Sequence, residues 1–73
     1  MGKKRMEIKT TCKRQFKFVR VWGQGVIEEY DPVTLSLYVI NGNRWVRVVY
    51  GDKQIFVRQD IANRHFYKAH HLQ

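Results

Sequence analysis

Two stretches of alternating apolar and polar residues, separated by glycine-containing turns, dominate the second half of the chain. Residues 35–61 run LSLYVINGNRWVRVVYGDKQIFVRQDI. Alternation with a period of two is typical of strands that bury one face. Asn41-Gly42 is the strongest short hairpin signal, and Gly51-Asp52 suits a second two-residue turn. The segment therefore predicts an antiparallel meander of three strands.

The two turns, assigned independently, sort the side chains in the same way. On one face they predict the cross-strand pairs Val39–Arg44, Leu37–Val46, Leu35–Val48, Val48–Ile55 and Val46–Val57. On the other face they predict the pairs Tyr38–Trp45, Ser36–Arg47, Arg47–Phe56 and Trp45–Arg58. A shift of one residue would reverse every side chain. The aliphatic face is thus expected in the core, and the second face collects rings and guanidinium groups.

The first half of the chain has less regular alternation. Residues 6–22, MEIKTTCKRQFKFVRVW, are rich in β-branched and aromatic residues and predict one strand or two. The adjacent apolar residues Phe18 and Val19 predict a bulge or bend there, which Gly23 and Gly25 would also suit. GVIEEYD continues the strand, and Asp31-Pro32 predicts the start of a type I turn.

The period changes near residue 60, where Asp60 can cap a helix. The predicted helix spans residues 60–72, and its apolar stripe consists of Ile61, Ala62, Phe66, Ala69 and Leu72. The chain length predicts one domain, with a disordered basic tail over residues 1–5, a β-barrel over residues 6–59 and the helix. Because about five short strands cannot build a sandwich, we expect a mainly β fold. It would be a small, strongly bent antiparallel barrel of the SH3-like or OB-like sort with a short C-terminal helix.

Charge points to a polyanionic partner. Fourteen Lys and Arg face six Asp and Glu, a net charge of +8. Residues 1–20 carry eight bases and only Glu7, whereas residues 21–43 carry Glu28, Glu29, Asp31 and no base. The partner classes are nucleic acid, an acidic protein or an anionic surface. The N-terminal bases are either a solvated surface or a phosphate-binding stripe, and the net charge favours the stripe.

No arrangement of residues indicates an enzyme, a cofactor or a metal site. His65, His70 and His71 lack zinc spacing, and no nucleophile lies at a meaningful distance from a base. Glu28 is expected to pair with Arg47. Cys12 lies among bases that could lower its pKa, but a plain strand residue is the favoured role. A single cysteine and no long apolar run predict an intracellular protein, cytoplasmic, nuclear or in the nucleoid, without membrane contact.

The face with rings and guanidinium groups has two interpretations. In one, Tyr38, Trp45 and Phe56 stack on bases, while seven basic residues contact phosphates: Lys13, Arg14, Lys17, Arg20, Arg44, Arg47 and Arg58. In the other, the C-terminal helix covers this face, the rings form a second small core, and Trp45 and Arg58 make a cation–π pair.

Two segments resemble known motifs. GVIEEYDPVTLSL resembles the first motif of Sm-like RNA-binding proteins, and IFVRQDI resembles the second. The resemblance implies a bent five-stranded barrel and a ring oligomer that binds RNA, with Asp31 and Arg58 near the RNA-binding loops. The chain differs from that family in having Gln59 after Arg58 and its helix at the end. YDPVTLSLYVINGNRW also resembles the C-terminal barrel of Mu-type DNA transposases, which implies a non-catalytic DNA-binding barrel, and Tudor-like barrels share the same turns.

The sequence thus predicts a small, basic, non-enzymatic protein that binds RNA or DNA. RNA or single strands are favoured over duplex because rings outnumber any candidate helix for the major groove. The alternative is an adaptor or inhibitor that docks the same basic, aromatic face on an acidic protein, since Trp, Tyr and Arg also dominate protein interfaces.

Overall fold

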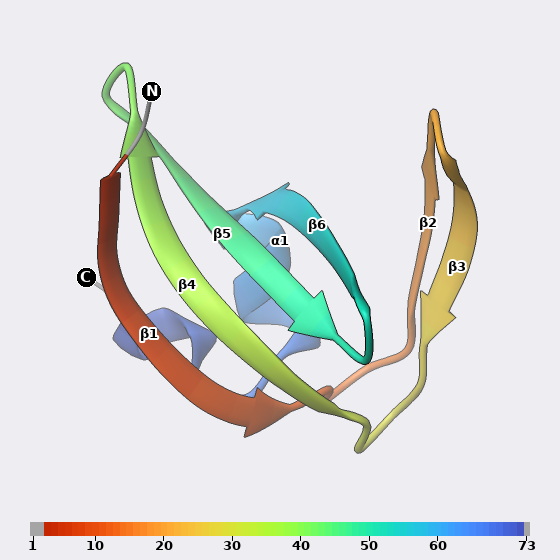
Figure 1. Cartoon of the computed structure of the whole chain (residues 1–73). Helices are drawn as coiled ribbons and strands as arrows, with labels where there is room; N and C mark the ends of the chain where they lie inside the picture. The colour runs from red at the N-terminus through yellow and green to blue at the C-terminus, as the bar shows by residue number, and fades with distance from the viewer. Residues whose placement is uncertain (1–2, 73) are drawn as a thin grey trace.

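The computed structural model describes residues 3–72 and is mainly β (Figure 1). A four-stranded antiparallel sheet has the order β1-β4-β5-β6, and β2 and β3 form a separate hairpin. The elements, in chain order, are β1 (Lys3–Thr11), β2 (Phe16–Arg20), β3 (Gly23–Ile27), β4 (Pro32–Ile40), β5 (Asn43–Tyr50), β6 (Lys53–Arg58), α1 (Gln59–His65) and the 3₁₀ helix η1 (Ala69–His71).

The meander of β4, β5 and β6 confirms both predicted registers. Leu37 faces Val46, and Trp45 faces Tyr38 on one side and Arg58 on the other. Asn41 and Gly42 have φ of 51° and 81°, the two positive values that a type I′ turn requires. Local turn chemistry and side-chain alternation therefore agree, and together they set the pairing of three strands.

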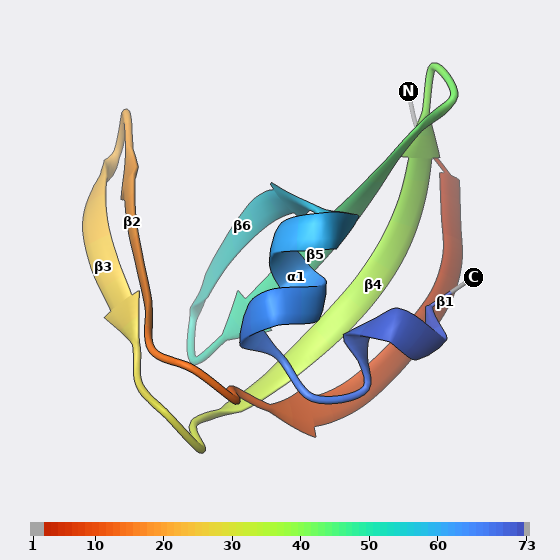
Figure 2. The same cartoon turned by 180° about the vertical axis from the view of Figure 1, so that it is seen from behind.

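The aliphatic face of the four-stranded sheet, called here the inner face, is buried against both helices (Figure 2). The sheet contributes Leu35, Leu37, Val46, Val48, Ile55 and Val57, and the C-terminal segment contributes Ala62, Phe66, Ala69 and Leu72. The interpretation in which the helix covers the aromatic face is therefore wrong. The helices pack on the aliphatic face because burying this face removes more apolar area from water than burying the face with guanidinium groups would.

The predicted helix over residues 60–72 is two shorter elements. α1 ends at His65 because Phe66 is extended and forms an isolated bridge with Cys12, and Lys68 then turns the chain with φ of 65°. The cap residue is Arg58, without a side-chain cap bond, so Asp60 lies in the first turn and pairs with Arg64 at 3.7 Å. The apolar spacing correctly predicted that Ala62, Phe66, Ala69 and Leu72 are buried, but Ile61 is only partly buried, and the spacing did not reveal the break between the two elements.

The first half of the chain also differs from the prediction. Residues 3–5 belong to β1 rather than to a tail, and Met1 and Gly2 lie outside the described residues. The chain leaves β1 at Cys12, so that β2 and β3 form a hairpin with regular register, without a bulge at Phe18 and Val19. The bulge lies instead in β1, between Lys4 and Met6. Although both are apolar, the Phe18 side chain enters the core, and the Val19 side chain faces water on the opposite side of the strand.

The turn before β4 begins at Glu28, three residues before the predicted start at Asp31. Asp31 closes it by donating its N–H to the Glu28 carbonyl (3.1 Å) and accepting the Glu28 N–H on its carboxylate (3.0 Å). Tyr30 takes the left-handed conformation, with φ of 73°. Pro32 then begins β4, a position where a missing N–H is tolerated.

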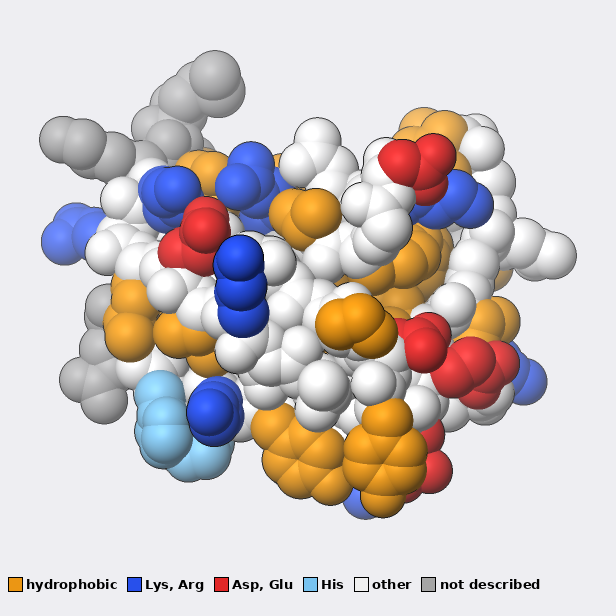
Figure 3. Space-filling model, turned by 60° about the horizontal axis from the view of Figure 1, so that its bottom comes forward, with side chains coloured by type: hydrophobic (Ala, Val, Ile, Leu, Met, Phe, Trp, Pro, Cys, Tyr) orange, Lys and Arg blue, Asp and Glu red, His pale blue; other side chains and the backbone are white. Residues whose placement is uncertain are grey.

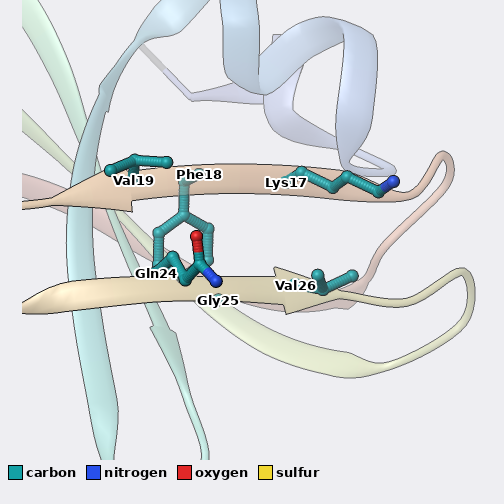
Figure 4. Close-up of a pocket in the computed structure, with 6 residues that line it drawn as sticks. All are labelled: Lys17, Phe18, Val19, Gln24, Gly25 and Val26. Atoms are coloured by element: carbon teal, nitrogen blue, oxygen red, sulfur yellow. The ribbon is translucent and has the colours of Figure 1, made fainter.

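The β2–β3 hairpin is anchored by aromatic packing. Phe18 contacts Phe16 and Tyr50, with ring centroids 5.9 and 5.7 Å apart. Its ring crosses Gly25, where a Cβ atom would lie 2.7 Å from Cζ of Phe18, so only glycine fits (Figure 4). A groove of about 560 Å³ runs along the hairpin, lined by Lys17, Phe18, Val19, Gln24, Gly25 and Val26.

Cys12 is fully buried where β1, the turn before β4 and the segment after α1 meet. Its thiol donates to the Arg14 carbonyl at 3.0 Å. Burial raises the pKa of the Cys12 thiol, and the nearby acids Asp31, Glu29 and Glu28 add to this. A reactive thiolate is thereby disfavoured, and the basic neighbours do not reverse the effect of burial.

This raised pKa predicts a loss of stability in alkaline solution. The unfolded chain ionises its thiol near the ordinary pKa of about 8.5, whereas the folded chain keeps it neutral to higher pH. The contribution of Cys12 is therefore complete below about pH 8.5 and is lost as pH rises toward the folded-state pKa. Urea midpoints at pH 7.5, 8.5 and 9.5 should fall for the natural chain and fall less for Cys12→Ala. Equal slopes for both proteins would contradict this prediction.

Candidate nucleic-acid interface

The face of the four-stranded sheet opposite the helices, called here the outer face, is not covered by either helix (Figures 1 and 2). The strand registers align its side chains in rows across β1, β4, β5 and β6. The three rows are Lys4–Tyr38–Trp45–Arg58, Glu7–Ser36–Arg47–Phe56 and Lys9–Thr34–Val49–Gln54. The predicted residues Tyr38, Trp45, Arg47, Phe56 and Arg58 thus share one surface.

Rings and cations alternate on this surface. The Arg58 guanidinium lies 5.0 Å from the centroid of Trp45, and that of Arg47 lies 5.5 Å from the centroid of Tyr38. Phe56 meets Tyr38 edge to face at 5.5 Å and keeps 43% of its surface exposed. Guanidinium planes extend the flat area beyond the rings themselves. The surface can accept a planar group on Phe56 or on a guanidinium.

The single carboxylate in these three rows is already neutralised. Glu7 pairs with Lys4 at 3.1 Å and accepts a hydrogen bond from the buried Ser36 hydroxyl at 3.2 Å. These contacts, Lys4 first, lower the pKa of Glu7, and the charge of Arg47 adds a smaller effect. Lys9, Arg47 and Arg58 have no carboxylate partner within residues 3–72. The rows therefore carry four cations against one paired acid.

The predicted ion pair between Glu28 and Arg47 does not form. Glu28 instead accepts a hydrogen bond from the Gln15 amide at 2.7 Å, while Glu7 is the acid near Arg47. Nε of Arg47 is buried and has no hydrogen-bond partner among the described residues. A donor in this state gains from an acceptor brought by a ligand.

The other predicted contact residues lie elsewhere. Arg44 bonds to Gln59 and to the Leu72 carbonyl (3.0 Å), so it fixes the C-terminal segment on the inner side. Lys13 donates to the Asn63 carbonyl at 3.2 Å, near α1. Arg14 follows it at the same end, where its carbonyl accepts the thiol of Cys12.

Lys17 and Arg20 belong to the hairpin. Lys17 is exposed on β2, away from the three rows. Arg20 donates to the Phe56 carbonyl at 3.0 Å and lies 5.7 Å from the Phe18 ring, so it sits at the border of the outer face. The structure brings together five of the ten predicted residues and places Arg20 beside them.

Sequence reasoning missed Lys4 and Lys9 as members of this face. The sequence predicts Lys4 in the basic tail and Lys9 in a general basic cluster. The alternation of Met6, Ile8 and Thr10 with Glu7 and Lys9 was a usable signal, because residues two apart share a face of a strand. Lys4 joins the same face only through the bulge that follows it, which the alternation does not reveal.

Charged side chains are unevenly distributed over the surface. In the view of Figure 3, carboxylates gather mainly on the right side, and Lys and Arg side chains are more frequent on the left. Within residues 3–72, no three His, Cys, Asp or Glu side chains come close enough to hold a metal ion. No helix of the described chain has the length and apolarity to cross a membrane.

Comparisons with protein-family models, with curated proteins and with solved structures find no match to this chain.

Proposed function

We propose that this chain is a non-enzymatic protein that binds single-stranded nucleic acid, with RNA slightly preferred, on its outer face. The observation that carries the proposal is the interleaving of three rings with four cations on a sheet face that the helices leave free. Exposed rings beside bases are how sheet surfaces bind single strands. Duplex is less suited because α1 has seven residues and packs its apolar side on the core, so residues 3–72 offer no long helix for a major groove.

In the proposed complex, bases stack on Phe56 and on the guanidinium that lies over Trp45, and phosphates contact the lysines of β1. Arg47 rotates on binding, so that its buried, unpartnered Nε reaches a phosphate or base oxygen. Stacking contributes about 1–3 kcal/mol per base and tolerates any sequence. The phosphate contacts release counterions, so that affinity falls as salt rises.

We further propose that the fold is an opened variant of a small SH3-like or Sm-like barrel. The bent four-stranded sheet, the β2–β3 hairpin that follows β1, and the bridge between Cys12 and Phe66 support this. We place the activity inside the cell, where an unpaired thiol such as that of Cys12 persists.

The test is a fluorescence titration in a Trp22→Phe background, which leaves Trp45 as the sole tryptophan. Single-stranded RNA, single-stranded DNA and duplex DNA of equal length are added at several salt concentrations. We expect quenching by the single strands. With four cations engaged, log K should fall with log salt with a slope of about −3.

Two charge variants make the test specific. Arg58→Gln should weaken binding. It should also make the slope of log K against log salt about 0.7 less steep, because one positive charge near the phosphates is lost. Lys17→Gln removes the same charge from the hairpin and should leave the slope unchanged. An absence of quenching by all three polymers, or an equal response to both substitutions, would refute the proposal. The first outcome would leave an acidic protein as the partner of this face.

A further inference from the structure

The β2–β3 hairpin presents one long edge that nothing in the described chain covers. In both ribbon views β3 is the outermost strand, and β2 lies between it and β6 (Figures 1 and 2). The Arg20 bond to the Phe56 carbonyl fixes the β2 side toward β6. Within residues 3–72, β3 pairs with β2 alone. The opposite edge of β3 therefore faces solvent.

Antiparallel geometry identifies the free backbone groups on that edge. The two-residue turn Val21–Trp22 is flanked by the pair Arg20–Gly23. Such a flanking pair is hydrogen-bonded, and along the ladder hydrogen-bonded pairs then alternate with non-hydrogen-bonded pairs. Gly23, Gly25 and Ile27 thus direct their backbone groups toward β2. Gln24 and Val26 direct their N–H and C=O groups outward.

The free edges of β1 and β3 differ in how well they are protected from pairing. β1, one of the two outer strands of the four-stranded sheet, carries Lys4, Arg5, Lys9 and a bulge, the features that stop a second strand from pairing. β3 has the sequence GQGVI and a regular register, with no charge, no proline and no bulge. One edge is protected and the other is left open for pairing.

The surroundings of the open edge are apolar. Val19 and Val21 are 73% and 107% exposed, and Trp22 and Val26 are about half exposed. All four lie on the hairpin, within eight residues of one another. A cluster of exposed apolar side chains beside an unblocked edge indicates a contact surface.

We infer that β3 pairs antiparallel with β3 of a second copy of this chain, around a twofold axis at Gly25. In this register Gln24 faces Val26 of the other copy, and the outward groups of these residues form four backbone hydrogen bonds. Gly25 faces its own equivalent in a non-hydrogen-bonded pair, where Cα atoms approach to about 4.5 Å. The absence of a side chain there removes any collision. The result is an isologous four-stranded sheet.

Charge complementarity favours a second copy over other occupants. Arg20 lies at the turn end of the hairpin, whereas Glu28, Glu29 and Asp31 follow β3 at the opposite end. The twofold register sets Glu28 of one copy opposite Trp22 of the other, where Lys53 lies 5.9 Å from the ring. A polyanion along this edge would meet the acids at one end. The pairing is independent of the proposed nucleic-acid binding.

The test is sedimentation equilibrium of the full chain, freed of nucleic acid by a high-salt wash, from 5 µM to 1 mM. Val26→Pro and Gln24→Pro each remove an outward N–H without touching the β2 ladder, and edge strands tolerate proline there. Each should weaken dimerisation about tenfold or more, because two of the four bonds are lost. Val26→Thr keeps the N–H and the β-branched shape and should dimerise like the natural chain.

Amide hydrogen exchange of the natural chain gives a second measure that needs no variant to fold. The N–H groups of Gln24 and Val26 should exchange more slowly at 1 mM than at 5 µM, while those of β1 should not change with concentration. A chain that stays monomeric at 1 mM overturns the inference. A dimer that survives both prolines, or whose exchange at Gln24 and Val26 is independent of concentration, overturns it as well.

Discussion

Replacement of Phe66 by alanine is expected to remove about half of the stability of this protein. Phe66 is 1% exposed and contacts Phe16 across the core with centroids 6.1 Å apart. Its backbone also forms the bridge to Cys12. Truncating a buried phenylalanine costs about 3–5 kcal/mol. A domain of this size has only about 4–11 kcal/mol in total, so the variant should unfold at a much lower urea concentration than the natural chain.

The matched control is Phe56→Ala, which deletes the same side chain from the outer face. Because Phe56 is 43% exposed and its main contact is the ring of Tyr38, the loss should be about 1 kcal/mol. Urea denaturation followed by circular dichroism measures both variants. Similar midpoints for the two would mean that the inner face does not carry the stability, contrary to the burial pattern.

The second large effect concerns binding. Trp45→Ala should weaken the affinity for single-stranded RNA by about 1–3 kcal/mol, or about 5- to 150-fold. The loss follows because the ring holds, at 5.0 Å, the Arg58 guanidinium on which a base stacks. Fluorescence anisotropy of a labelled oligonucleotide measures the change without relying on tryptophan emission.

The control for this variant is Trp22→Ala, which removes the other tryptophan from the hairpin turn, away from the three rows of the outer face. Its affinity should match that of the natural chain. Equal losses in the two variants would indicate a contact that is not confined to the outer face. No loss in Trp45→Ala, with the fold intact, would remove the stacking role.

The meander could be predicted from sequence because its pairing is determined by short turns and by the alternation of neighbouring residues. Asn41-Gly42 admits few turn types, and one shift of register would expose Leu37 and Val46 together. The hairpin β2–β3 could not be predicted in this way, since Phe18 beside Val19 suggested a bulge. The structure shows that Phe18 lies over Gly25 and points to the core, whereas Val19 faces water.

Part of the outer face could be predicted because it lies within the meander, whose registers follow from local turns. Registers inside the meander united Trp45 with Arg58, but the partners from β1 depend on a pairing between segments about thirty residues apart. Arg44 shows a second limit of sequence patterns. It lies in the run that supplies Trp45 and Arg47, yet its side chain holds the carbonyl of Leu72, a contact that no local pattern encodes.

The insertion of the hairpin between β1 and β4 bears on the order of events during synthesis. β4, β5 and β6 join through two-residue turns and need only neighbouring residues to pair, whereas β1 must wait for β4, about twenty residues later. As the chain is made, β1 emerges first and has no partner until the hairpin has been completed. Its lysines then act before folding as well as after it, because they keep the unpaired strand from pairing with a neighbouring nascent chain.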